Sequence, residues 1–209
     1  MSIDKRRAIG GGLIASAGLF LGASTASAQA TSAVPEGATL CVTCHGMHGE
    51  GAPTGAPRLA GQNAEYMSHA LSMFKATTRA SPIMQPIARS LSNAQIGALA
   101  EYFSKQTVPL ADRPFVASSQ LPHTGKQLAE VGVANVAACF SCHGAQGKGS
   151  GARFPAIAGQ PAQFLVDRLH EFQARARAKV PQPGTMTAVA STLNEGQIQA
   201  AAAFLSRLP

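Results

Sequence analysis

The sequence predicts an all-α protein built from two small domains in tandem. The chain has 209 residues, of which 45% are hydrophobic and 13% are charged, and this composition excludes a disordered protein. Much of its second half repeats the first at an offset of 98 residues, which favours two domains over one. Apolar residues recur at helical spacing, and alternations typical of strands are few.

Residues 1–28 have the pattern of a cleaved export signal. Three basic residues at positions 5–7 precede an apolar stretch from Ile9 to Gly22, and Ala26-Ser27-Ala28 supplies an Ala-x-Ala cleavage site. The apolar stretch is short and rich in glycine, which disfavours a retained membrane anchor. We therefore expect a protein of the periplasm, exported by general secretion, whose mature chain has a net charge of +5.

The repeat places the first domain at residues 29–106 and the second at residues 123–209. The connector between them, residues 107–122, contains Pro109 and Pro114 and has the composition of a linker. Because each copy carries its own apolar pattern, we expect each domain to have a separate core.

Two helical patterns recur in each copy. An apolar stripe covers Tyr66–Phe74 and its counterpart Phe164–Phe172. The last helix of each copy is introduced by a capping box, at Ser92–Gln95 and at Asn194–Gln197. Each domain is therefore predicted to be small and helical.

The four cysteines form two pairs, and a histidine directly follows each pair. Cys-x-x-Cys-His is the attachment signature of c-type haem, because two thiols three positions apart on a helical turn reach the two vinyl groups while the adjacent histidine meets the iron. The predicted residues are Cys41, Cys44 and His45, and Cys139, Cys142 and His143. We therefore predict two covalently bound haem c groups.

Three other uses of the cysteine pairs are weaker. A thioredoxin-like redox pair needs a βαβ context that the sequence lacks. A zinc site would have to join cysteines from separate domains. Disulfides are permitted in an exported protein, but they would leave both histidines unexplained.

A methionine is predicted as the sixth iron ligand in each copy. The second copy contains only Met186, in a proline-rich loop before the last helix, and the repeat aligns it with Met84. Met67 and Met73 fall on the Tyr66–Phe74 helix, where packing is expected. The remaining histidines have no histidine counterpart in the other copy, so we expect surface roles for His48, His69, His123 and His170.

With these motifs the chain resembles class I cytochromes c, and specifically the di-haem cytochrome c4 family. The resemblance rests on the duplicated Cys-x-x-Cys-His-Gly, the Leu-Ala-Gly-Gln and Ile-Ala-Gly-Gln segments, and a methionine before the final helix. It implies two tandem class I cytochrome c domains, each wrapped around one covalently bound haem c. It also implies that the carbonyls of Pro57 and Pro155 accept the Nδ1 protons of His45 and His143.

The two copies differ at their start. Residues 125–138 are long enough for the N-terminal helix that usually packs on the last helix in this family. Only residues 29–40 precede the first cysteine pair, and Pro35 lies among them. The N-terminal helix of the first domain is therefore expected to be short or missing.

The resemblance implies a periplasmic electron carrier of a respiratory chain rather than an enzyme. Its expected partners are redox proteins such as a quinol-oxidising complex and a terminal oxidase, met as a soluble or loosely membrane-associated protein. One alternative is an electron-accepting subunit of an enzyme complex, such as a flavocytochrome sulfide dehydrogenase. Another is a di-haem peroxidase, which the paired methionines disfavour because they fill the sixth position.

Positive charge is concentrated in the second domain. Residues 123–209 carry a net charge of +4, against +1 for residues 29–106, and four cations gather near the end of one helix: Arg168, Arg175, Arg177 and Lys179. They form either a solvated helix face or a docking surface for an acidic partner. Nucleic acid is not expected as a partner in the periplasm.

Overall fold

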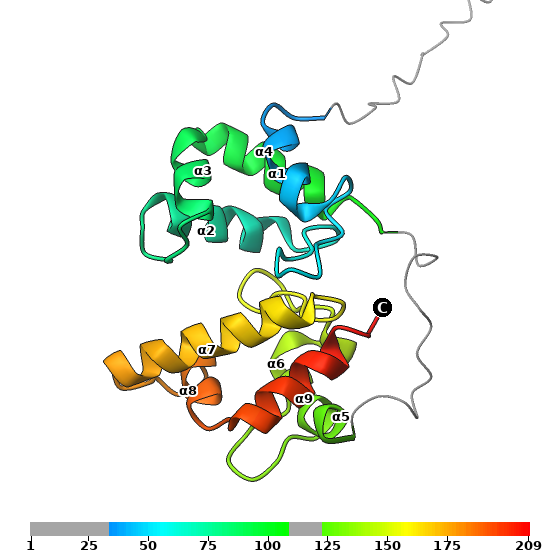
Figure 1. Ribbon diagram of the computed structural model, residues 1–209, viewed down its shortest axis with the longest axis vertical. Coiled ribbons are helices and arrows are strands. Elements are labelled where there is room, and N and C mark those ends of the chain that lie inside the picture. The colour runs from blue at the N-terminus through cyan, green and yellow to red at the C-terminus, as the bar shows by residue number, and fades with distance from the viewer. Residues whose placement is uncertain (1–33, 109–122) are drawn as a thin grey trace, which may run out of the picture. The chain divides into compact units, whose positions relative to one another are not determined.

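The computed structural model describes residues 34–108 and 123–209 (Figure 1). The predicted export signal and residues 109–122 of the predicted connector lie outside the described residues. Within the described ranges the only β-structure consists of isolated bridges, at Val133 with Val136 and at Ser150 with Phe154. The predicted all-α fold is confirmed.

Residues 34–108 form a small helical unit of four helices: α1 (Ala38–His45), α2 (Ala64–Lys75), α3 (Met84–Ser90) and α4 (Asn93–Ser104). The predicted apolar stripe forms α2, which begins where the side chain of Asn63 accepts a hydrogen bond from the backbone N–H of Tyr66. The predicted capping box starts α4, since Ser92 and Gln95 each bond the other's backbone N–H.

Residues 123–209 repeat this arrangement with an additional helix at the start. Its helical elements are α5 (His123–Glu130), α6 (Cys139–His143), the short 3₁₀ turn η3 (Ala145–Gly147), α7 (Ala162–Ala178), α8 (Met186–Ser191) and α9 (Glu195–Leu205). The predicted capping box at Asn194 and Gln197 introduces α9. The predicted N-terminal helix is present as α5, but it ends eight residues earlier than the expected range.

No helix precedes α1 within residues 34–37, in agreement with the expected difference between the copies. Gly37 adopts a left-handed conformation, with a φ of 88°, directly before α1, and α1 itself runs through the cysteine motif. In the second half α5 and α6 are separate helices.

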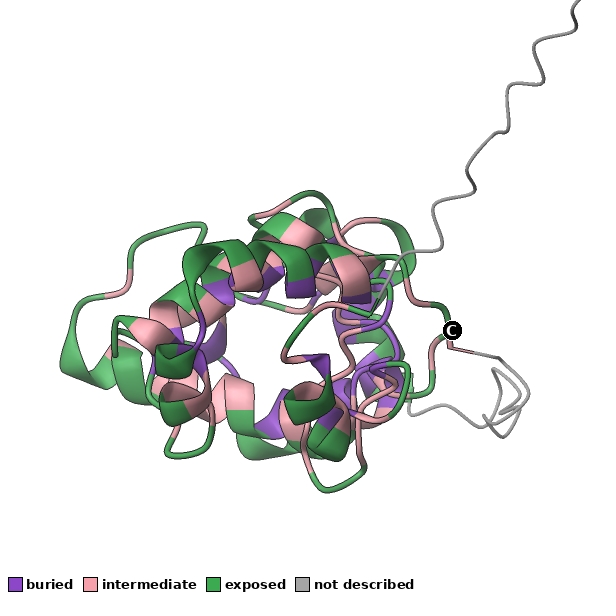
Figure 2. Cartoon of the chain, turned by 90° about the horizontal axis from the view of Figure 1, so that it is seen from above, coloured by how far each residue is buried: buried purple, intermediate pink, exposed green. Residues whose placement is uncertain are grey.

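Each half has its own hydrophobic core. In the first half α2 packs against α3 and α4, and Phe103 and Leu99 are almost completely buried between them. In the second half α9 packs against α5 and α7, around Phe204 and Ile198. Figure 2 shows that the helices carry buried residues on one side and exposed residues on the other. None of the helices within the described ranges is long and apolar enough to cross a membrane.

The close packing of α5 on α9 depends on Gly125. A Cβ atom at this position would overlap the carbonyl oxygen of Ala200 and would lie 2.7 Å from Cβ of Phe204. We therefore expect Gly125→Ala to lower the free energy of unfolding by about 1–3 kcal/mol, because overpacking forces the two helices apart.

The control is Gly97→Ala in α4, where nothing lies within 4 Å of an added Cβ. This change should raise the stability by up to about 1 kcal/mol, because alanine is the better helix former. Thermal and denaturant unfolding of the holoprotein measures both effects. Equal stability of the two variants would show that α5 does not pack on α9 as described.

Candidate haem sites

Each cysteine pair lies on one short helix that ends at the motif histidine. Cys41 and Cys44 belong to α1, Cys139 and Cys142 belong to α6, and none of the four forms a disulfide. Cys41 and Cys139 are half-buried, and burial raises the pKa of both thiols.

A glycine fixes the turn after each motif. Gly144 has a φ of 74°, and a Cβ there would lie 2.5 Å from the carbonyl oxygen of Gly149. The N–H of Gly149 in turn bonds to the carbonyl of His143 at 2.7 Å, and the equivalent bond joins Gly51 to His45 at 2.8 Å. The chain therefore turns sharply back over the histidine in both halves.

His45 and His143 have the same environment. Nδ1 of His45 lies 2.7 Å from the carbonyl oxygen of Pro57, and Nδ1 of His143 lies 2.7 Å from that of Pro155. Both side chains are buried, and burial lowers their pKa although the prolyl carbonyls act in the opposite sense. A neutral imidazole that donates from Nδ1 keeps its lone pair on Nε2, the state required of an iron ligand.

The loop that carries each proline is anchored twice. The carbonyl of Gly49 accepts hydrogen bonds from the N–H groups of Leu59 and Ala60, and that of Gly147 accepts the equivalent pair from Ile157 and Ala158. The next residue bonds to the last helix, since the Gly61 N–H reaches the Phe103 carbonyl and the Gly159 N–H reaches that of Leu205. The core helices therefore position the prolyl carbonyls.

Met84 and Met186 are half-buried and occupy equivalent positions, each as the first residue of a short helix. Met186 was expected in a proline-rich loop, but it is the first residue of α8. Pro86 falls in the first turn of α3, where proline is tolerated because the N–H groups there have no helical partner. In α8 the prolines end before Thr185, whose hydroxyl caps the helix.

The competing donors are less suitable. His48, His69 and His123 are exposed, and Nε2 of His170 lies 2.8 Å from a carboxylate oxygen of Glu195. Met67 is buried in the core of the first half, as expected for a packing role. Nowhere in residues 34–108 and 123–209 do three His, Cys, Asp or Glu side chains gather as a metal site.

Arg79 is buried and Arg168 is half-buried, although their positions gave no indication of this in the sequence. Arg79 is only 7% exposed, its guanidinium lies 4.5 Å from the centroid of the Phe74 ring, and its Nε has no hydrogen-bond partner. Arg168 stacks on Phe172 at 4.6 Å and its side chain is 13% exposed, so it is more shielded than Arg175, Arg177 and Lys179.

The two arginines influence each other. Burial, together with the charge of Arg79, lowers the pKa of Arg168 to about 10. Within the described residues no carboxylate pairs with Arg79. A buried guanidinium needs an anionic or hydrogen-bonding partner, and haem propionates have the chemistry to supply it. The donor set of both halves thus fits haem c.

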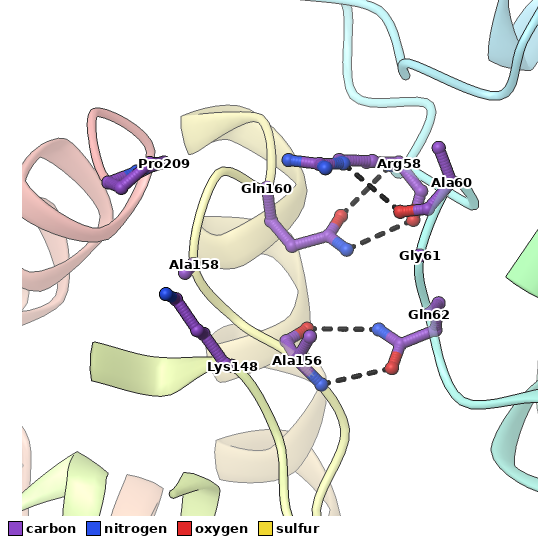
Figure 3. Close-up of a pocket in the computed structure, with 9 residues that line it drawn as sticks. All are labelled: Arg58, Ala60, Gly61, Gln62, Lys148, Ala156, Ala158, Gln160 and Pro209. Carbon is purple, nitrogen blue, oxygen red and sulfur yellow. Dashed lines mark hydrogen bonds between the residues drawn. The ribbon is translucent and has the colours of Figure 1, made fainter. Parts of the chain in front are cut away.

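Two glutamines connect the halves through backbone hydrogen bonds (Figure 3). The side chain of Gln62 bonds both the N–H and the carbonyl of Ala156, each at 3.0 Å. The side chain of Gln160 bonds the N–H of Arg58 at 2.9 Å and its carbonyl at 3.0 Å. The repeat identified both Gly-Gln segments, but it did not indicate that either glutamine reaches the other copy.

Comparison with known proteins gives consistent matches over both halves. The family model described as cytochrome c matches residues 37–107 and 124–209. A thiosulfate dehydrogenase electron acceptor from Stutzerimonas stutzeri (strain A1501) is 35% identical over 175 residues, which cover 82% of this chain and 80% of that protein.

Two solved structures show the same arrangement. The cytochrome c4 of Acidithiobacillus ferrooxidans matches with a TM-score of 0.67 and 35% identity, over 81% of this chain and 99% of its own. The thiosulfate dehydrogenase of Marichromatium purpuratum matches with a TM-score of 0.70 and 33% identity, but the match spans only 36% of that longer chain. The chain therefore belongs to the cytochrome c family, as a di-haem electron-transfer protein of the cytochrome c4 type with two covalently bound haem c groups.

Proposed function

We propose that this chain is exported to the periplasm and carries electrons there between respiratory redox proteins. In this proposal residues 29–106 and 123–209 are the two haem domains of the mature chain. The observation that carries the proposal is the 2.7 Å hydrogen bond from a buried histidine Nδ1 to a prolyl carbonyl, present in both halves.

The proposed iron ligands are His45 with Met84 and His143 with Met186. The four motif cysteines would hold the two haems by thioethers. Haem iron supplies one-electron chemistry when bound. A thioether ligand favours ferrous iron and fills the sixth position, which suits electron transfer and disfavours peroxide chemistry.

The chain's own residues support this role by fixing and shielding the sites. The prolyl carbonyls hold each imidazole with Nε2 deprotonated, and the loop bonds to the last helix resist rotation of the ring. The two apolar cores exclude water from one side of each site. Little rearrangement is then needed when charge changes, as an electron carrier requires.

A terminal oxidase is the proposed electron acceptor, and a quinol-oxidising complex is one proposed donor. A second candidate donor is a thiosulfate dehydrogenase, because a relative with 35% identity is named as the electron acceptor of that enzyme. With a thiosulfate dehydrogenase as donor, the chain would accept electrons from an enzyme, as in the flavocytochrome alternative. The enzyme would be a different one.

The proposed docking surface is the exposed end of α7. Arg175, Arg177 and Lys179 are exposed there, whereas Arg168 is half-buried against Phe172. Three neighbouring cations attract an acidic partner and raise the encounter rate when ionic strength is low.

We expect the oxidised holoprotein to be reduced by thiosulfate only when a thiosulfate dehydrogenase is present, and to be reoxidised by membranes that contain a terminal oxidase. Replacing Arg175, Arg177 and Lys179 together with glutamine should slow the reaction with a partner about threefold to tenfold at low salt, since steering contributes about 10- to 1000-fold to encounter rates. Stopped-flow absorbance at increasing salt concentrations measures these rates.

Lys126→Gln, an exposed change on α5, is the matched control and should leave the rates unchanged. Absence of reduction by the dehydrogenase would eliminate the thiosulfate candidate alone. Failure of oxidase-containing membranes to oxidise the reduced protein would contradict the carrier role itself. Reaction rates that do not depend on salt concentration would argue against the proposed docking surface.

A further inference from the structure

The peptide unit whose carbonyl accepts a hydrogen bond from each haem histidine is itself hydrogen-bonded to a glutamine of the other half. The carbonyl of Pro57 accepts from Nδ1 of His45, and the N–H of the same peptide unit, which belongs to Arg58, donates to Oε1 of Gln160 at 2.9 Å. In the second half the Pro155 carbonyl accepts from His143, and the Ala156 N–H donates to Oε1 of Gln62 at 3.0 Å (Figure 3).

Both contacts therefore act on one resonance-coupled group. The peptide C–N bond has partial double-bond character, so withdrawal of the N–H proton toward an acceptor increases the negative charge on the carbonyl oxygen. Hydrogen bonds in such a chain strengthen one another, by about 10–30% per bond in condensed phases. An acceptor on the N–H side thus makes the prolyl carbonyl a better partner for the histidine Nδ1–H.

The orientation of each glutamine is fixed by its second bond. Nε2 of Gln160 donates to the carbonyl of Arg58 at 3.0 Å, and Nε2 of Gln62 donates to the carbonyl of Ala156 at 3.0 Å. A backbone N–H can only donate and a backbone carbonyl can only accept, so the amide cannot be reversed without losing both bonds. Oε1 therefore faces the peptide N–H in both cases.

Burial increases the effect of these bonds. Gln62 is 5% exposed and Gln160 is 4% exposed, so water does not compete for the amides. Oε1 of Gln62 also accepts the N–H of Asn63 at 3.0 Å, which further restrains that side chain. Gln62 is therefore held in position by three hydrogen bonds and Gln160 by two.

We propose that each glutamine is a positioning residue that tunes the haem of the opposite half. Gln160 acts on the first haem through the Pro57–Arg58 peptide and His45, and Gln62 acts on the second haem through the Pro155–Ala156 peptide and His143. This inference rests on the proposed role of the two histidines as iron ligands. A stronger Nδ1 hydrogen bond makes the imidazole more basic, which stabilises ferric iron and lowers the reduction potential.

The test replaces one glutamine at a time with methionine, which has similar length and cannot make either bond. Gln160→Met should raise the potential of the first haem and leave the second unchanged, and Gln62→Met should do the reverse. We expect the ferrous-to-ferric ratio of the affected haem at fixed potential to rise about twofold, equivalent to about 18 mV at 59 mV per tenfold change for one electron.

Redox titration followed by proton NMR resolves the two haems in the intact holoprotein. Gln62→Glu is the second variant, because its carboxylate keeps an acceptor for the Ala156 N–H while losing the donor to the Ala156 carbonyl. It weakens the junction but should not raise the potential of the second haem. In both methionine variants the amide proton of the affected peptide should also move upfield.

A crossed pattern supports the proposal, since looser packing at the junction would change both haems in each variant. The proposal is overturned if each variant shifts the haem of its own half, if both haems shift equally, or if Gln62→Glu raises the potential as much as Gln62→Met. Failure of the ligand assignment would be seen separately, as absence of the His/Met near-infrared absorption in the unmodified protein.

Discussion

Replacing Cys41 and Cys44 together with alanine is expected to unfold most of residues 34–108 while leaving residues 123–209 folded. The described first half has 75 residues, and a core of this size supplies only about 3–5 kcal/mol. No helix within residues 34–37 covers α4 in the way that α5 covers α9. Without a tethered haem this half loses the apolar group around which its four helices pack.

Circular dichroism, limited proteolysis and the haem-to-protein ratio test this expectation. The variant should lose one of its two haems, about half of its helical signal, and its resistance to protease in the first half. The matched control is the Cys139→Ala, Cys142→Ala variant, which should show the reciprocal pattern in residues 123–209. Full helical signal with cooperative unfolding in either variant would show that the protein core alone specifies the fold.

The buried Arg79 indicates that the first half needs more than its apolar core. Arg79 carries a charge into the interior, and the energy of burying it is compensated only in part by the Phe74 ring and by Tyr66. In the apoprotein part of the energetic cost of burying the Arg79 charge therefore remains, and an anionic group in the site would remove it. This cost further destabilises the first half when the cysteines are replaced.

Local rules explain why much of the fold could be predicted from the sequence. The capping residues Ser92 and Asn194 set the start of the last helices, and an apolar stripe defined α2 and α7, because these signals act within a few residues. The offset of 98, which becomes 102 after a four-residue insertion, then carried each assignment from one copy to the other. The family resemblance, rather than spacing alone, assigned Pro57 and Pro155 to the histidines.

The errors and omissions concern contacts between distant segments. The prolines before Met186 suggested a loop that includes this residue, but the Thr185 hydroxyl accepts the N–H of Ala188 and caps a helix that begins at Met186. Arg168 was grouped with its exposed neighbours, but its side chain is only 13% exposed and it feels the charge of Arg79, which lies far away along the chain. Gln62 and Gln160 reach the other copy for a similar reason. The sequence did offer one signal for this contact: both copies have a glutamine at the same position, directly after an apolar segment.

Replacing Met186 with alanine is expected to open the sixth position of the second haem and leave the first unchanged. Met186 is half-buried at the start of α8, in the position equivalent to Met84. The rival donors His48, His69, His123 and His170 are not buried. Loss of a thioether ligand should lower the potential of that haem and allow it to bind imidazole or cyanide.

Near-infrared absorption of the ferric protein, redox titration and imidazole binding measure these changes, and Met84→Ala should give the same result at the first haem. Two controls separate ligation from packing. Met67→Ala should cost about 2–5 kcal/mol of stability because this side chain is buried in the core, yet it should retain both near-infrared signals. Met47→Ala, at a position that is 67% exposed, should change neither. Unchanged absorption and no imidazole binding in Met186→Ala would reject methionine as the ligand and return the assignment to another donor of the second half.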